Sequence, residues 1–263
     1  MINLQKFSED LLAIREKSPL VVNITNYVAM NINANALLAI GASPIMSFYA
    51  REMDEMLTIA GALVVNIGCL DDNEIDGMRA AVSAASRHGK PWVLDPVGAG
   101  ASRVRTATAL ELIDIGRPAI IRGNASEIIC LNNSSGNSKG VDSTAASQEA
   151  LPHAIALAKR FGCVVSVSGA TDYITDGTRV ETITNGSPMM SKITAMGCTA
   201  SAVTGAFAAV SEPFEAAFGA MALMGVAGEK AAEGASGTGS MSVRFMDFLS
   251  SARPEEVAAA VRQ

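Results

Sequence analysis

Residues 62–95 read ALVVNIGCLDDNEIDGMRAAVSAASRHGKPWVLD and contain the pattern on which the prediction of the fold depends. The pattern predicts a strand at Ala62–Ile67, a helix at Asn73–His88 and a second strand at Pro91–Leu94 that ends at Asp95. The first strand is a near-continuous apolar run, which is typical of a parallel strand covered on both faces. A strand, a helix and a second strand in this order form a βαβ unit, and such units build a mostly parallel sheet.

The same alternation of short apolar runs and Ala-rich segments continues on both sides of this unit. Strands are predicted at Leu20–Ile24, Ser43–Ser47, Ala119–Arg122 and Cys163–Ser168, helices at Met1–Lys17, Val28–Ile40, Glu52–Ile59, Thr106–Ile115 and Ser143–Phe161, and a loop at Asn132–Gly140. Two further runs, Asp172–Asp176 and Arg179–Thr184, flank an Asp-Gly turn and predict a hairpin. From Cys198 onward the chain is predicted to be helical almost to its end. We therefore expect one α/β domain over residues 1–263, with a mostly parallel central sheet and helices on both faces.

The composition excludes several classes of protein. The 263 residues carry a formal charge of -6, and no cluster of Lys and Arg marks a nucleic-acid binder. Hydrophobic residues make up 49%, but no apolar run approaches the ~20 residues that a membrane span requires. The four cysteines form no CxxC pair and only two histidines are present, which excludes a disulfide framework and a zinc site. The N-terminal segment has no signal-peptide pattern, so we expect a cytoplasmic protein without nucleic-acid or membrane partners.

The segment Lys192–Ala200, KITAMGCTA, places a turn with one glycine directly ahead of a long Ala-rich helix. The first amides of a helix lack internal partners and lie at the positive end of its dipole. Such a turn can therefore stabilise the charge of a phosphoryl group. The alternative is a plain strand-to-helix connection, because one glycine before a helix is a weak signal.

Polar residues follow three of the predicted strands. Asp95 leads into a Gly-rich loop, at the carboxyl end of a strand where open α/β sheets gather their ligands. Asn124 and Glu127 have the spacing of a helix capping box, which is their structural interpretation. The pair Ser168-Gly169 offers a hydroxyl to a phosphate oxygen and a close backbone approach, although a Ser-Gly pair after a strand is common.

The N-terminal segment is rich in asparagine. Residues 19–28 read PLVVNITNYV, and residues 41–46 read GASPIM. Buried amides must be paired, so capping and hydrogen bonding between elements are the plain interpretation of Asn23 and Asn26. Met46 taken alone is a core residue.

Together these motifs resemble those of the hydroxyethylthiazole kinases, which have the ribokinase-like fold. The segments NITN, GASPIM and DPVGA occur in the order and spacing typical of that family, and the resemblance runs from about Ser18 to about Ser250. It implies ATP- and Mg²⁺-dependent phosphorylation of the hydroxyl of 4-methyl-5-(2-hydroxyethyl)thiazole, giving the thiazole phosphate for thiamin biosynthesis. It also implies a homotrimer with sites between subunits, which would account for the high apolar content.

The resemblance implies roles for the residues around the substrate. Gly197 and Cys198 end the anion-hole turn, whose last residue is the catalytic base. That base is commonly Asp, but hydroxyethylthiazole kinases carry Cys there, and a helix start should favour the thiolate. The alternative is a small Cys that only helps the hydroxyl to fit. Met46 matches the methionine that contacts the thiazole, and Asn26 matches a position near the hydroxyethyl group. Ala195 stands where many relatives have Gly, and a backbone contact with the substrate would survive that change.

The resemblance also implies a set of residues for the nucleotide and the metal. Asn124 and Glu127 match an N-x-x-E motif on which magnesium and the nucleotide phosphates depend. Asp95 and Glu127 are expected to position Mg²⁺, since hard oxygen ligands suit that ion. Arg122 is expected to contact the phosphates through its planar fork, the alternative being a surface salt bridge. Ser168 is expected to contact ATP.

Two other functions stay open at this point. One is a different activity on the same fold: a kinase for another vitamin or for a sugar, or a nucleotide-dependent dehydratase of a damaged nicotinamide cofactor. The other is a nucleotide-binding or thiazole-binding module with little turnover, because the usual acid is replaced by Cys198.

Overall fold

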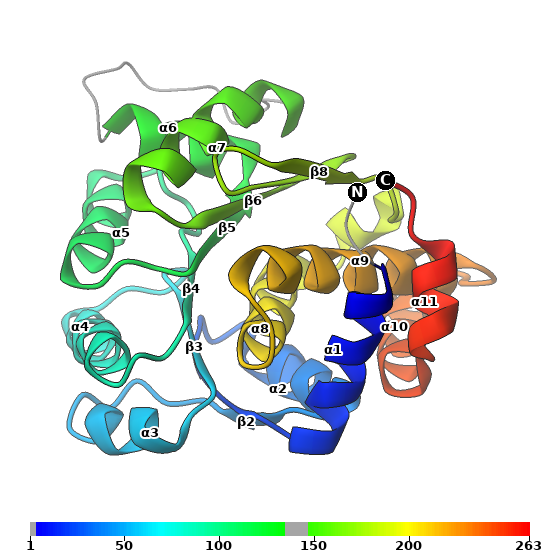
Figure 1. Ribbon diagram of the computed structural model, residues 1–263, viewed down its shortest axis with the longest axis horizontal. Coiled ribbons are helices and arrows are strands. Elements are labelled where there is room, and N and C mark those ends of the chain that lie inside the picture. The colour runs from blue at the N-terminus through cyan, green and yellow to red at the C-terminus, as the bar shows by residue number, and fades with distance from the viewer. Residues whose placement is uncertain (1–3, 135–146) are drawn as a thin grey trace.

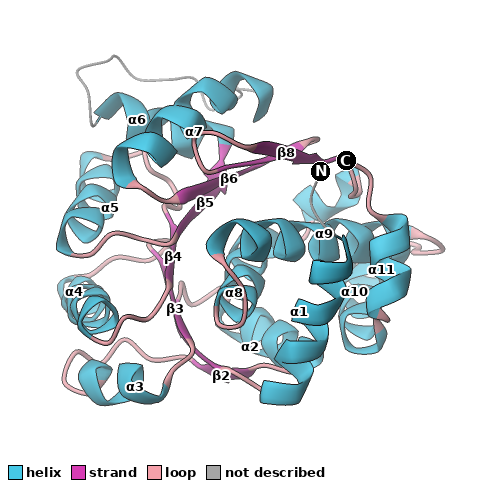
Figure 2. Ribbon diagram, in the orientation of Figure 1, coloured by secondary structure: helices cyan, strands magenta, loops and turns pink. Residues whose placement is uncertain are grey.

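The computed structural model describes residues 4–134 and 147–263 and is built on one central sheet. Its strands are β1 (Leu20–Ile24), β2 (Ser43–Ile45), β3 (Ala62–Asn66), β4 (Trp92–Asp95), β5 (Ile120–Asn124), β6 (Val164–Ser168), β7 (Asp172–Thr175) and β8 (Val180–Ile183). They lie in the order β2-β1-β3-β4-β5-β6-β7-β8, parallel up to β6 and antiparallel from there to β8. The predicted mostly parallel sheet and its terminal hairpin are therefore confirmed (Figure 2).

Helices cover both faces of this curved sheet, as predicted (Figure 1). The outer layer contains α3 (Met53–Ile59), α4 (Asp72–Arg87), α5 (Arg103–Ile115), α6 (Ala125–Ser134) and α7 (Ser147–Phe161). The layer within the curve contains α1 (Leu4–Lys17), α2 (Met30–Ile40), α8 (Met196–Ala208), α9 (Pro213–Ala232), α10 (Thr238–Ser251) and α11 (Pro254–Ala260), and the short 3-10 helix η1 (Pro188–Lys192) follows β8.

Alternate residues of each strand face two separate cores. In β3, Val64 packs in the core shared with α8, while Leu63 and Val65 pack in the core of the outer layer. Gly205 of α8 lies directly against this strand, because a Cβ at that position would approach Cγ2 of Val64 to 2.3 Å. The glycine thus lets α8 lie close to the sheet, with its first turn near the carboxyl ends of the strands.

The boundaries of the predicted elements agree with the observed ones to within one helical turn wherever both are described. The C-terminal helical region is divided into separate helices, with Pro213 and Pro254 each in a first turn, where proline needs no hydrogen-bond partner. The predicted loop Asn132–Gly140 is partly wrong, because α6 continues to Ser134. The remainder of that loop and the predicted start of the Ser143–Phe161 helix lie outside the described residues. In the described part of the chain, no helix is long and apolar enough to cross a membrane.

Candidate active site

The carboxyl ends of the parallel strands meet the first turn of α8. Nη1 of Arg122 on β5 donates to the carbonyl of Gly197 at 2.9 Å. Oγ of Ser201, one turn further along α8, donates to Oδ2 of Asp95 at 2.7 Å. The fold therefore brings three predicted site residues, Asp95, Arg122 and Gly197, together at the first turn of α8, although they are far apart in the sequence.

The turn before α8 has an unusual backbone. Ala195 is the N-terminal cap of the helix and has φ 65°, in the left-handed region, and its carbonyl accepts a hydrogen bond from Thr199 N at 2.8 Å. A Cβ at Gly197 would approach Nη1 of Arg122 to 2.9 Å, so the glycine leaves room for the guanidinium. The turn that was predicted to hold a phosphoryl group is therefore packed against a cation.

The conformation of Ala195 leads to a test by substitution. A side chain in the left-handed region costs ~1–2 kcal/mol, and glycine avoids that cost. We expect Ala195→Gly to raise the free energy of unfolding by about 1 kcal/mol, measured by chemical denaturation. The matched control is Ala209→Gly at the other end of α8, where φ is -70° and glycine should lower stability. Equal losses in both variants would show that Ala195 is not strained.

The thiol of Cys198 contacts the side chain of Asn26. Nδ2 of Asn26 lies 3.3 Å from Sγ of Cys198 and donates to Oδ1 of Asn66 at 3.0 Å, while Oδ1 of Asn26 accepts from Ala29 N at 3.1 Å. Burial raises the pKa of the Cys198 thiol, as does the negative charge of Asp95, and the hydrogen bonds from Asn26 and Asn66 do not offset these effects. Burial and the charge of Asp95 therefore act against the thiolate that a helix start was expected to favour.

Asp95 is buried at the end of β4. Its Oδ2 accepts hydrogen bonds from Nδ2 of Asn66 at 2.7 Å and from Oγ of Ser201. Burial raises the pKa of this carboxyl, and Arg122 and the two hydrogen bonds act against that rise. The protonation of Asp95 thus depends on the charge of Arg122 and on the hydrogen bonds from Asn66 and Ser201.

Asn124 and Glu127 form the capping box that their spacing predicted. Oδ1 of Asn124 accepts from Glu127 N at 3.0 Å, and Oε2 of Glu127 accepts from Asn124 N at 2.8 Å. The second carboxylate oxygen, Oε1, accepts from Gly98 N at 2.9 Å. Burial and the charge of Asp95 both raise the pKa of Glu127. The structural interpretation of this motif as a capping box is therefore confirmed. The carboxylate of Glu127 also lies close enough to Asp95 for the two negative charges to repel each other.

These two carboxylates suit Mg²⁺ by their chemistry. Each is a hard oxygen donor, and their mutual repulsion would be relieved by a cation between or near them. Among the described residues, no cluster of three or more His, Cys, Asp or Glu side chains could hold a metal. The residues present therefore fit an ion held by few carboxylates together with water and phosphate, as is usual for Mg²⁺.

A cavity of about 530 Å³ opens beside Arg122. Its polar wall includes Arg122, Ser168, Asp172 and Gly197, and its apolar wall includes Met190, Met221 and Met224. Arg122 is only 6% exposed and its Nε has no hydrogen-bond partner in the described structure, so the alternative of a surface salt bridge is wrong. Because a buried donor without a partner is costly, the guanidinium is suited to a ligand that supplies acceptor oxygens.

The other end of the polar wall is the turn after β6. Oγ of Ser168 donates to the carbonyl of Gly123 at 3.4 Å, and Asp172 accepts from Gly169 N at 2.9 Å. Burial raises the pKa of Asp172 to about 7, against the effects of that hydrogen bond and of Arg122. The structure thus places Ser168 on the cavity, next to an acid whose pKa is raised to about 7.

The cavity and the Asn26–Cys198 contact lie on different sides of the helix start. Gly197 lines the cavity, whereas Cys198 and Ala195 are not among its lining residues. Asn26 follows β1, which is separated from β5 in the sheet by β3 and β4. The first turn of α8 is therefore positioned between a cavity large enough for a nucleotide and a second polar region near Asn26.

The remaining predicted residue, Met46, lies away from that cavity. It is half-buried just beyond β2 and does not line the space beside Arg122. Three residues that the motifs did not reveal are Asn66, Asp172 and Ser201, all of which hold site residues or line the cavity. Of these three residues, only Asn66 could have been noticed in the sequence, because it is a lone amide in an apolar strand. In the sheet, Asn66 pairs in register with Asp95.

The fold is shared with solved structures of low sequence identity. A ribokinase-like superfamily protein from Enterococcus faecalis V583 superposes with a TM-score of 0.64 at 12% identity, covering 90% of this chain and 87% of that one. The fold is therefore that of the ribokinase-like α/β proteins, and the predicted fold class is confirmed.

The sequence narrows this class to one family. The model of the hydroxyethylthiazole kinase family matches residues 11–255, and the chain belongs to that family. A hydroxyethylthiazole kinase from Leptospira biflexa is 54% identical over 242 residues, covering 92% of this chain and 91% of that protein. The structure of a hydroxyethylthiazole kinase protein from Pyrococcus horikoshii OT3 superposes with a TM-score of 0.91 at 40% identity, covering 98% of both chains. The resemblance carried by NITN, GASPIM and DPVGA is therefore confirmed.

Proposed function

We propose that this chain transfers the γ-phosphoryl group of ATP to the hydroxyl of 4-methyl-5-(2-hydroxyethyl)thiazole, giving the thiazole phosphate for thiamin biosynthesis. The observation that carries the proposal is the contact between Arg122 and Gly197, which places a buried cation and a helix start at one end of a cavity of about 530 Å³. Family membership supports the choice of substrate. The product would be a phosphate monoester. We also propose that residues 1–263 form a single kinase domain.

The nucleotide would bind in the cavity beside Arg122. Arg122 and Ser168 would contact the phosphates, because a guanidinium and a hydroxyl both donate to phosphate oxygens. The apolar wall of Met221 and Met224 suits the flat face of a base, since thioethers pack well against aromatic rings. Bound Mg²⁺ would neutralise charge on the phosphates, held near Asp95 and Glu127 with Asn124 capping the helix that carries Glu127.

The thiazole alcohol would bind on the other side of the helix start, near Asn26 and Met46. Its hydroxyl oxygen forms the new bond to the γ-phosphorus, the bond from that phosphorus to the β,γ-bridging oxygen breaks, and ADP leaves. Cys198 accepts the hydroxyl proton, while the backbone at Ala195 and Gly197 contacts substrate and stabilises the charge of the transferring group. The contact between Asn26 and Cys198 holds the thiol at this position.

The proposal extends to assembly and location. Large apolar side chains are exposed next to the predicted substrate residues: Tyr27 is 59% exposed, Val28 65% and Tyr49 57%. Their exposure supports the homotrimer with sites between subunits that we propose, in which a neighbouring subunit would cover them. Four free cysteines support a reducing cytoplasm, and the net charge of -6 supports a protein without nucleic-acid or membrane partners.

An ADP-release screen tests this function. ATP and Mg²⁺ are supplied with the thiazole alcohol, with hydroxymethylpyrimidine or with common sugars, and ADP is measured by a coupled assay. We expect release with the thiazole alcohol at the highest kcat/KM. Preference for the pyrimidine or a sugar would support the other kinases of this fold, and ATP binding without ADP release would support the binding module.

Glu127→Gln separates the metal role of this residue from its capping role. The neutral amide removes a charge near the metal, so we expect the Mg²⁺ concentration for half-maximal activity to rise about tenfold, with KM for the thiazole alcohol nearly unchanged. The carboxylate of Glu127 accepts hydrogen bonds from the backbone N–H groups of Gly98 and Asn124. The amide of Gln has one acceptor oxygen, so one of these N–H groups loses its partner, which costs ~1–2 kcal/mol of stability. Magnesium titration and thermal denaturation measure the two effects. A change in stability alone would mean that Glu127 only caps α6.

A further inference from the structure

One part of the wall of the cavity beside Arg122 is held by residues near the end of the described chain. Thr184, Asn185 and Gly186 connect β8 to η1 and line the cavity. Asn185 is only 6% exposed, and its Nδ2 donates to Oε2 of Glu229 on α9 and to the carbonyl of Ala260, both at 2.9 Å. Gly186 N donates to Oε1 of Glu229 at 3.0 Å. The segment from Thr184 to Gly186 is therefore fixed to α9 and to the residues after α11.

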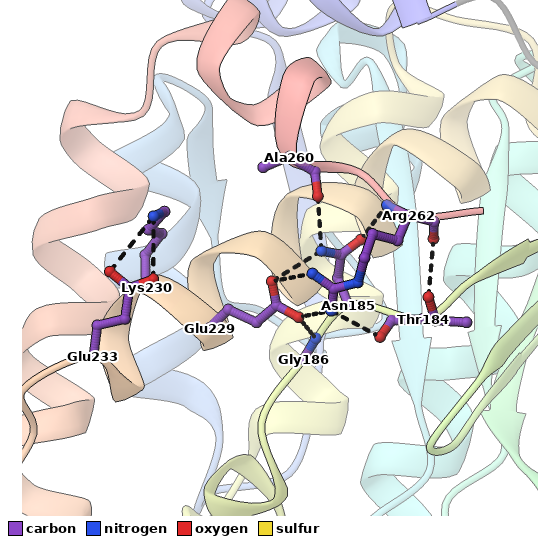
Figure 3. A network of polar contacts seen from close by, with 8 residues as sticks. All are labelled: Thr184, Asn185, Gly186, Glu229, Lys230, Glu233, Ala260 and Arg262. Atoms are coloured by element: carbon purple, nitrogen blue, oxygen red, sulfur yellow. Dashed lines mark hydrogen bonds and ion pairs between the residues drawn. The ribbon is translucent and has the colours of Figure 1, made fainter.

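Arg262 completes this network. Its backbone N–H donates to Oδ1 of Asn185 at 2.7 Å, and its carbonyl accepts from Thr184 N at 2.9 Å. Its guanidinium reaches the carboxylate of Glu229 through both terminal nitrogens, and Nη2 also donates to the carbonyl of Thr184 at 3.2 Å. Figure 3 shows Arg262, Asn185 and Glu229 pointing toward one another, with the Lys230–Glu233 pair apart from them.

The electrostatics and the packing indicate that this network fixes one position of the wall. Although burial acts to raise it, the pKa of Glu229 is lowered by the hydrogen bonds from Arg262, Asn185 and Gly186. Gly186 has φ 136°, in the region that favours glycine, and Gly225 leaves room for Asn185, since a Cβ there would approach Cβ of Asn185 to 2.8 Å. A paired, ionised carboxylate beside two glycines thus holds the segment close to α9.

We propose that Arg262, acting through Glu229 and Asn185, is a positioning residue for the nucleotide, because it holds the wall of the cavity formed by Thr184–Gly186. This inference rests on the proposed binding of ATP in that cavity. Arg262 touches no reacting atom and does not line the cavity itself. It lies beyond residues 11–255, which the family model matches, so the contact is not part of the matched pattern. Loss of the guanidinium lets the wall move, and that motion weakens the binding of ATP but not of the thiazole alcohol.

Steady-state kinetics and calorimetry on the full chain test the proposal. For Arg262→Ala we expect KM for ATP and its dissociation constant to rise about tenfold, with kcat and KM for the thiazole alcohol changing less than about twofold. Arg262→Lys should fall between this variant and the natural protein, because it keeps the charge without the fork. The control is Lys230→Ala on α9, the helix that carries Glu229; this variant removes an exposed ion pair and should leave all constants unchanged.

The outcomes separate this inference from the proposed function. If Arg262→Ala bound ATP as well as the natural protein does, the positioning role alone would be overturned. Equal changes in both KM values and in kcat would show a general effect on folding and would also overturn it. Natural protein that binds no ATP would overturn both this inference and the proposed function.

Discussion

Replacing Arg122 with methionine should lower kcat/KM for ATP at least about a hundredfold, because the variant loses a preorganised cation at the helix start. The side chain is buried, its Nη1 bonds the carbonyl of Gly197, and its Nε has no partner in the described structure. Methionine keeps much of the apolar stem and removes the charge. Arg122→Lys keeps the charge as a single point and should lose about tenfold. Initial rates at varied ATP measure both effects.

The same substitution also affects stability, so it needs a matched control. Arg122 is the positive charge that opposes the raised pKa values of Asp95, Glu127 and Asp172. Its removal leaves buried carboxyl groups without compensation, which costs about 3 kcal/mol. Arg105 is the control, since it donates to the carbonyls at 67, 68 and 97 without lining the cavity. If Arg105→Met lost as much kcat/KM as Arg122→Met, the role of Arg122 would be structural.

The fold could be predicted from the sequence because its signals are local. The apolar run Ala62–Ile67 and the helical segment after it each indicate one element, and their order requires parallel pairing. The capping box of Asn124 and Glu127 was predictable for the same reason, since its residues are three positions apart. Local patterns therefore gave the strands, the helices and the caps.

Contacts between distant segments could not be predicted in the same way. Ser201 donates to Asp95 across 106 positions of sequence, and Arg262 contacts Glu229 through the packing of α9 and the residues after α11. Such contacts depend on the register of the sheet and on how closely α8 and α9 approach it. The effects of burial and of Asp95 on the pKa of Cys198 could not be predicted for this reason, because both are properties of the packed structure.

Cys198→Ala and Cys198→Asp together decide whether this residue is the base. If it accepts the proton, alanine should lower kcat about 10²–10³-fold, and aspartate should retain or raise activity at neutral pH. A base acts only when deprotonated, and burial together with Asp95 raises the pKa of the thiol. In the natural protein kcat should therefore rise with pH, from neutral pH to beyond the range in which an ordinary thiol titrates. A carboxylate ionises at lower pH, so the aspartate variant should show a flat profile over that range.

The pH profile distinguishes a base from a residue that only fits the hydroxyl. A thiol that merely fills space would give the same profile in the natural protein and in both variants, because no titrating group at this position would limit the rate. Complete loss of activity in a folded Cys198→Asp protein would also contradict the base role, since an ionised carboxylate at the helix start should accept the proton in place of the thiolate. Cys130→Ala on α6, away from the cavity beside Arg122, is the control for loss of a thiol in general. The raised pKa of Cys198 thus makes the mechanism testable, because a base that is mostly protonated at neutral pH must give a kcat that increases as the pH rises.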